Sequence, residues 1–173
     1  MSSKSTLKQM ILAAMFLALA LVLPFLTGQI PQIGNMLCPM HIPVLLCGFF
    51  CGPWYGLAVG LIAPLLRFAL FGMPPLIPTG AAMCCELAVY GLSAGILYRI
   101  LPGKKIYIYV ALFGAMLVGR IVWAMAMTVL SGLGYAAFSR QAFLAGAFVN
   151  AVPGIIIQAI LIPLLVMTLK KRE

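Results

Sequence analysis

The chain has 173 residues, of which 65% are hydrophobic and only 8% are charged, and its formal net charge is +9 at pH 7. A soluble domain is roughly 45–50% apolar and about a quarter charged, so this composition excludes a soluble globular fold. We expect an all-α integral membrane protein with one domain over residues 1–173, whose basic residues flank membrane segments rather than bind nucleic acid.

Six apolar segments are separated by turns rich in glycine, proline and amide side chains. A spanning helix needs about 20 mostly apolar residues, and the second segment is short for that length. The predicted spans are residues 7–26, 38–52, 54–72, 79–101, 106–131 and 141–169. The first could instead be a signal peptide, but no small-x-small cleavage site follows its apolar core, so we expect a retained helix.

Lysine and arginine gather in alternate loops, and this asymmetry predicts the orientation, because short cytoplasmic loops carry an excess of both. With the N-terminus inside, the outer loops hold Arg140 alone. The cytoplasmic flanks then hold Lys4, Lys8, Arg99, Lys104, Lys105, Lys170, Lys171 and Arg172. Both termini are therefore expected in the cytoplasm.

Three ionisable side chains lie well inside the apolar segments: Arg67, Glu86 and Arg120. Such groups cost about 2.5–3.5 kcal/mol each on insertion scales, and those that remain are usually functional. At 1.5 Å of rise per residue they lie roughly 7, 10 and 16 Å below the outer ends of their helices. Two positive charges against one negative charge predict a pocket, open to the outside, that binds an anion.

Each of these charges also has a structural alternative. Arg120 is too deep to reach the interface easily, so it either binds a carboxylate of the ligand or pairs with Glu86. Glu86 neutralises one of the arginines or accepts hydrogen bonds from the ligand. Arg67 is shallow enough to extend to the membrane surface instead of facing the pocket.

Other polar or aromatic residues are candidates for the same pocket. Trp123 follows Arg120 by three residues and either lines the cavity or packs between helices. His41 lies near the outer end of the second segment, as a ligand contact or a helix-end residue. Asn150 belongs to a four-residue repeat with Gly154 and Gln158 that is also typical of close helix packing.

The sequence lacks the motifs of membrane enzymes. No Walker motif, His-Glu-x-x-His pattern or metal-ligand cluster is present, and one histidine and two acids are too few for such chemistry. The five cysteines are expected to be small packing residues. We expect no enzyme activity, catalytic residue, metal or cofactor, so any energy from ATP must come through a partner.

Two stretches carry a resemblance to a known family. They are Asn35 to Gly48, NMLCPMHIPVLLCG, and Gly52 to Gly60, GPWYGLAVG. Together with the six predicted helices, these stretches carry the resemblance. Over nearly its whole length, the chain resembles the substrate-binding S component of energy-coupling factor (ECF) vitamin transporters. The stretches most resemble the pantothenate branch.

The resemblance implies a subunit of the bacterial cell membrane that captures a vitamin from outside. It implies partners as well, a membrane scaffold protein with two ATPases, on which the subunit docks and topples to release its substrate. Residues of the first helix, Ala14 and Ala18, would contact the scaffold. The first loop would place Gln29, Gln32 and Asn35 near the ligand.

The charge count favours pantothenate, a monoanion with hydroxyls and an amide. Riboflavin is neutral and fits less well, a dianionic folate needs a larger basic surplus, and biotin and niacin fit on charge alone. A small oligomeric channel or transporter that works without ATPases is an alternative, as is an assembly protein with no ligand. The lack of ionisable residues in the inner half of the membrane argues against the channel.

Overall fold

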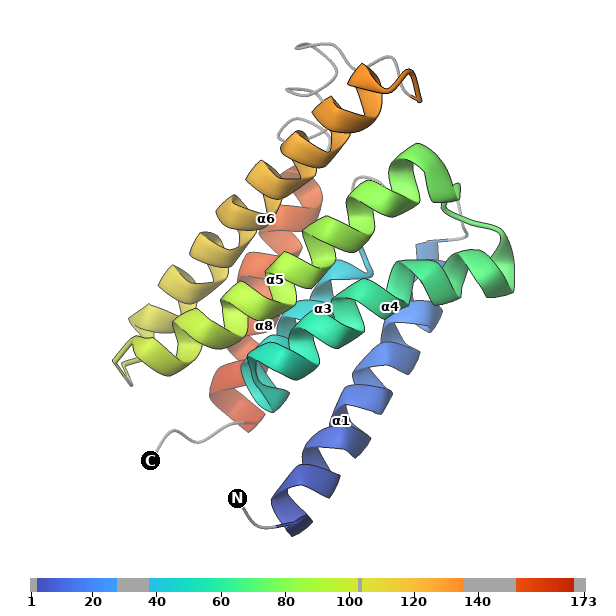
Figure 1. Cartoon of the computed structure of the whole chain (residues 1–173). Coiled ribbons are helices and arrows are strands. Elements are labelled where there is room, and N and C mark those ends of the chain that lie inside the picture. The colour runs from blue at the N-terminus through green and yellow to red at the C-terminus, as the bar shows by residue number, and fades with distance from the viewer. Residues whose placement is uncertain (1–2, 28–37, 103, 136–151, 170–173) are drawn as a thin grey trace.

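The structure is a computed structural model that describes residues 3–27, 38–102, 104–135 and 152–169. Within these ranges the regular elements are all helical (Figure 1). They are α1 (Ser3–Val22), the 3-10 helix η1 (Leu23–Thr27), α3 (His41–Cys51), α4 (Pro53–Phe71), the irregular turn η2 (Leu76–Gly80), α5 (Ala81–Ile100), α6 (Ile106–Gly132) and α8 (Val152–Leu169).

Five of the described helices are long and apolar enough to cross a membrane: α1 with η1, α4, α5 with η2, α6 and α8. The expected spans 54–72, 79–101 and 106–131 agree with α4, α5 and α6 to within two residues at each end. The expected sixth span, 141–169, is described only from residue 152. An all-helical, multi-pass membrane fold is therefore confirmed.

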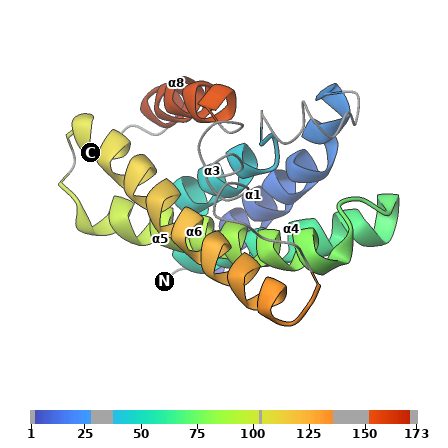
Figure 2. The ribbon, with the colours of Figure 1, turned by 90° about the horizontal axis from the view of Figure 1, so that it is seen from above.

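The second expected span, residues 38–52, is short, and the helix within it is shorter still. Its helix α3 has 11 residues, which cover about 16 Å against a hydrocarbon core of about 30 Å. Ten of the 11 residues are buried. The segment is apolar because α3 packs in the middle of the bundle, in contact with α1, α4, α5 and α8 (Figure 2).

Both described ends of the chain lie at one end of the bundle. The first residue of α1 and the last residue of α8 are there, together with the α3–α4 and α5–α6 connections (Figure 1). We call this the terminal end and the opposite one the distal end. At the terminal end Gly52, with φ of 101°, reverses the chain, and Pro53 begins α4 because a first helical position needs no free N–H.

Glycines allow α3, α4 and α5 to touch through their backbones. A Cβ at Gly91 of α5 would collide with the carbonyl of Gly56 on α4, and one at Gly60 would collide with the Leu87 carbonyl. Gly48 of α3 meets the Gly91 carbonyl in the same way. The small-residue pairs Gly56/Gly60 and Gly91/Gly95 therefore form a helix interface, as small residues do in membranes.

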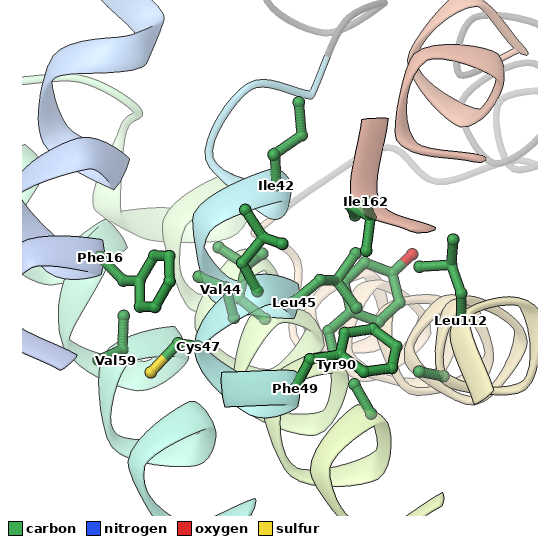
Figure 3. Close-up of a cluster of buried hydrophobic side chains, with 14 of the residues drawn as sticks. Phe16, Ile42, Val44, Leu45, Cys47, Phe49, Val59, Tyr90, Leu112 and Ile162 are labelled. Carbon is green, nitrogen blue, oxygen red and sulfur yellow. The ribbon is translucent and has the colours of Figure 1, made fainter. Parts of the chain in front are cut away.

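The core forms around α3. Its Val44 and Leu45 are fully buried and lie among side chains from every surrounding helix (Figure 3). These are Phe16 of α1, Val59 of α4, Tyr90 of α5, Leu112 of α6 and Ile162 of α8.

We predict that Gly91→Ala destabilises the protein by about 1–3 kcal/mol, because its Cβ must displace the α4 backbone. The control is Gly132→Ala at the exposed end of α6, where a Cβ meets nothing within 4 Å. Alanine also has the higher helix propensity, so the control should be as stable as the wild type or slightly more stable. Thermal unfolding in detergent measures both, and equal melting temperatures would contradict the backbone contact.

Candidate functional site

A cluster of polar side chains lies inside the bundle where α3, α5 and α6 meet. The Glu86 carboxylate oxygen Oε1 lies 3.2 Å from Arg120 Nη1 and 3.5 Å from His41 Nε2. Glu86 is only 2% exposed. Cys38 lies beside them, with its Sγ 3.9 Å from Arg120 Nη2. We call Cys38, His41, Glu86 and Arg120 the polar cluster.

The side chains of Leu45, Tyr90, Leu112 and Ile162 belong to the hydrophobic core (Figure 3). We call them the floor, because they lie on the terminal side of the polar cluster. His41 comes one helical turn before Leu45 on α3, and Glu86 comes one turn before Tyr90 on α5. The Tyr90 ring packs edge-on against the His41 ring, with ring centroids 5.2 Å apart. The floor residue Tyr90 therefore packs directly against a member of the polar cluster.

The contacts of Arg120 leave one edge of its guanidinium without a strong hydrogen-bond partner among the described residues. Nη1 faces Glu86, Nη2 makes only the long contact with Cys38 Sγ, and Nε has no hydrogen-bond partner among the described residues. The two N–H groups on the Nε–Nη2 edge are parallel and match the two oxygens of a carboxylate. Arg120 therefore keeps a buried N–H group that no described residue uses, on the side of the guanidinium away from Glu86.

The charge balance of the cluster differs from the expected surplus. The charges of Arg120 and Glu86 cancel. The second positive charge of the expected surplus belongs to Arg67, which is not in the polar cluster.

Arg67 lies at the distal end of α4 and holds the end of α1. Its Nη1 donates a 2.9 Å hydrogen bond to the carbonyl of Leu21, and its guanidinium lies over the rings of Phe25 and Phe71. The residue is 5% exposed, so it does not extend to the membrane surface. Its described contacts join α4 to α1, and none reaches the polar cluster.

The remaining candidates are placed only in part. Trp123 is half-buried on α6, one turn beyond Arg120 toward the distal end. Ala14 and Ala18 are exposed on α1. Gln29, Gln32, Asn35 and Asn150 lie outside the described residues.

The sequence interpretation missed two neighbours of the cluster and a separate cavity. Tyr90 was detectable, because it follows Glu86 by four residues on one helix. Cys38 gave no signal beyond its position three residues before His41. The cavity, of about 270 Å³, lies at the terminal end between Gln9, Phe49, Gly52 and Arg99, away from the polar cluster. Among the described residues, no group of three His, Cys, Asp or Glu side chains could hold a metal ion.

Comparison with known proteins gives the family. A sequence model described as "ECF transporter, substrate-specific component" matches residues 8–166. The chain belongs to this family. Comparisons with curated proteins and with solved structures found no match.

This S component is the substrate-binding subunit of an ECF transporter, and not an enzyme. The family implies a vitamin as the substrate and an ECF module as the partner. The expectation of a binding protein that depends on a partner is thus confirmed in general terms.

We predict that Arg67→Met lowers the free energy of unfolding by about 1.5–3 kcal/mol, the range for hydrogen bonds to charged groups, and leaves vitamin affinity unchanged. The reason is that Arg67 bonds to the backbone of α1 and not to the polar cluster. Arg99→Met, at an exposed arginine of the terminal end, is the control and should change neither quantity. Loss of vitamin binding without loss of stability in Arg67→Met would place Arg67 in the binding site instead.

Proposed function

We propose that this S component binds pantothenate on the outer side of a bacterial cell membrane and delivers it to a scaffold protein with two ATPases. The observation that carries the proposal is the guanidinium of Arg120, held by Glu86 on one side and open along its Nε–Nη2 edge. This edge is the carboxylate site, and Glu86 and His41 bind the polar groups of the substrate.

The distribution of charge supports a site open to the outside. Lys8, Arg99, Lys104 and Lys105 all lie at the terminal end, which the excess of basic residues makes cytoplasmic. Glu86 is fourteen residues from the terminal end of α5, about 21 Å along the helix. Below it the floor residues are at most 1% exposed. The floor closes the path to the cytoplasm, which also argues against an open channel.

The chemistry of pantothenate fits the groups of the polar cluster. Its carboxylate suits Arg120, and its hydroxyl and amide groups suit the acceptor oxygens of Glu86 and the ring nitrogens of His41. Both His41 nitrogens lack a hydrogen-bond partner among the described residues. Riboflavin has no carboxylate for Arg120, and folate brings two where the cluster has one arginine. Biotin and niacin match the charge and are the alternatives.

Trp123, half-buried beyond Arg120, lies where it can line the outer part of this site, and Asn150, Asn35, Gln32 and Gln29 belong to segments that we propose complete it. Arg67 is left out, because its contacts are with α1.

The exposed face of α1 is the surface that we propose contacts the scaffold protein. Ala14 and Ala18 are exposed there, with Ile11 and Met15 beside them at 62% and 49% exposure. Small residues on an exposed apolar face allow a second helix to approach closely. Arg67 fixes the far end of the same helix.

We predict that mass spectrometry of the purified protein finds pantothenate bound stoichiometrically, and that Arg120→Ala abolishes its retention. Truncating one partner of a buried charge pair costs about 2–5 kcal/mol in binding, which corresponds to at least a 30-fold loss of affinity. Arg99→Ala, which removes an exposed arginine, is the control and should retain the vitamin.

Arg120→Ala leaves Glu86 buried without its partner, so the fold could suffer as well. The double variant Glu86→Gln/Arg120→Met removes both charges and tests binding in a neutral cluster. Normal retention of pantothenate by either variant would contradict the carboxylate site.

A further inference from the structure

The carboxamide of Gln158 is a buried polar group that the site described so far does not use. Gln158 lies on α8 and is 2% exposed. Its oxygen Oε1 accepts no hydrogen bond from any described residue. An unsatisfied buried acceptor costs about 1–3 kcal/mol, so a carboxamide at this depth calls for a donor.

The helical repeat places Gln158 at the level of the polar cluster. On α8 the buried residues Gly154, Gln158, Ile162 and Val166 recur every four positions and face the bundle. Ile162 belongs to the floor, where it lies beside Tyr90 and Leu112 (Figure 3). Gln158 lies one turn from Ile162 toward the distal end, about 6 Å along the helix.

His41 and Glu86 lie at the same level as Gln158. His41 is one turn toward the distal end from Leu45, and Glu86 is one turn toward the distal end from Tyr90. Helix α8 packs against α3, which carries His41, and against α6, which carries Arg120. The carboxamide of Gln158 is therefore buried at the level of the polar cluster, on a helix that packs against two of the three helices that carry the cluster.

We propose that Gln158 is a substrate-binding residue whose Oε1 accepts a hydrogen bond from an N–H or O–H group of the ligand. The site then selects a carboxylate that carries a separate hydrogen-bond donor. This inference rests on the proposed function, because Arg120 must hold the carboxylate.

The polar cluster has few hydrogen-bond acceptors, so the oxygen of Gln158 can decide which ligands bind. Glu86 Oε1 is an acceptor on the α5 side of the site, and Gln158 Oε1 adds an acceptor on the α8 side. A buried acceptor that is satisfied only by the right ligand rejects analogues that lack the donor. Pantothenate has amide and hydroxyl donors, and biotin has ureido N–H groups. Nicotinate has no donor besides its carboxyl group and should be rejected.

The test is isothermal titration of the purified full-length wild type and of Gln158→Met with pantothenate, biotin and nicotinate. Methionine has nearly the shape of glutamine and removes the oxygen. We expect roughly a 10- to 100-fold loss of affinity for pantothenate, with a melting temperature of the ligand-free protein that is unchanged or higher. Ile160→Met, at a residue of α8 that is 64% exposed and faces away from the bundle, is the control and should bind as the wild type does.

Gln158→Asn is a second variant in case Gln158→Met does not fold. It keeps the carboxamide but withdraws it by one methylene, and it should also weaken binding at least tenfold without loss of stability. Unchanged affinity in a folded variant overturns the proposal. So does a fall in the stability of the ligand-free protein with unchanged affinity, because the donor is then part of the chain itself.

The wild-type titrations separate this proposal from the proposed function. Tight binding of biotin in place of pantothenate overturns the pantothenate assignment, whereas a loss of biotin affinity in Gln158→Met still supports the role of Gln158. Tightest binding of nicotinate overturns the selection for a donor. A protein that binds none of the three carboxylates overturns both.

Discussion

The contact between Glu86 and Arg120 is the constraint on which the binding site depends. Two opposite charges lie 3.2 Å apart inside a bundle made almost wholly of apolar side chains. Removing either partner leaves a buried charge that costs several kcal/mol, so α5 and α6 must keep the register that joins them. The same contact occupies one nitrogen of the guanidinium and orients the rest. In the proposed site, a substrate carboxylate meets an arginine that is already positioned, which lowers the entropic cost of binding.

The short helix α3 makes room for this contact. Because its 11 residues cover only about 16 Å, α3 begins inside the bundle and not at the membrane surface. Its first residue, His41, therefore lies next to Glu86, and Leu45 one turn later belongs to the floor. The backbone contacts at Gly48, Gly56 and Gly91 hold α3, α4 and α5 close enough for this arrangement. A polar layer above an apolar floor is thus a consequence of helix length and of glycine placement.

The sequence predicted most of the fold, because long apolar runs bounded by glycine and proline define membrane helices directly. It could not predict the extent of α3, since apolar character is the same for a residue facing lipid and for one in the core. The pair of Glu86 and Arg120 was one of two interpretations of rare buried charges. Arg67 was counted with them because it is also an ionisable residue inside an apolar segment. Its actual partner could not be predicted, since the Leu21 carbonyl is a backbone atom 46 residues away in the sequence. Gln158 was noted only as part of a four-residue repeat with Asn150 and Gly154, and its relation to His41 required the packing of α8 against α3.

The most direct test of the account compares two ligands that differ only at the carboxylate. The affinities of the wild type and of Arg120→Met are measured for pantothenate and for its neutral analogue, in which CH₂OH replaces the carboxylate. If Arg120 binds the carboxylate, the wild type prefers pantothenate by roughly 30-fold or more, and Arg120→Met binds both ligands weakly with no preference for pantothenate. A preference for pantothenate that persists in Arg120→Met would contradict the account, because the carboxylate would then be bound elsewhere.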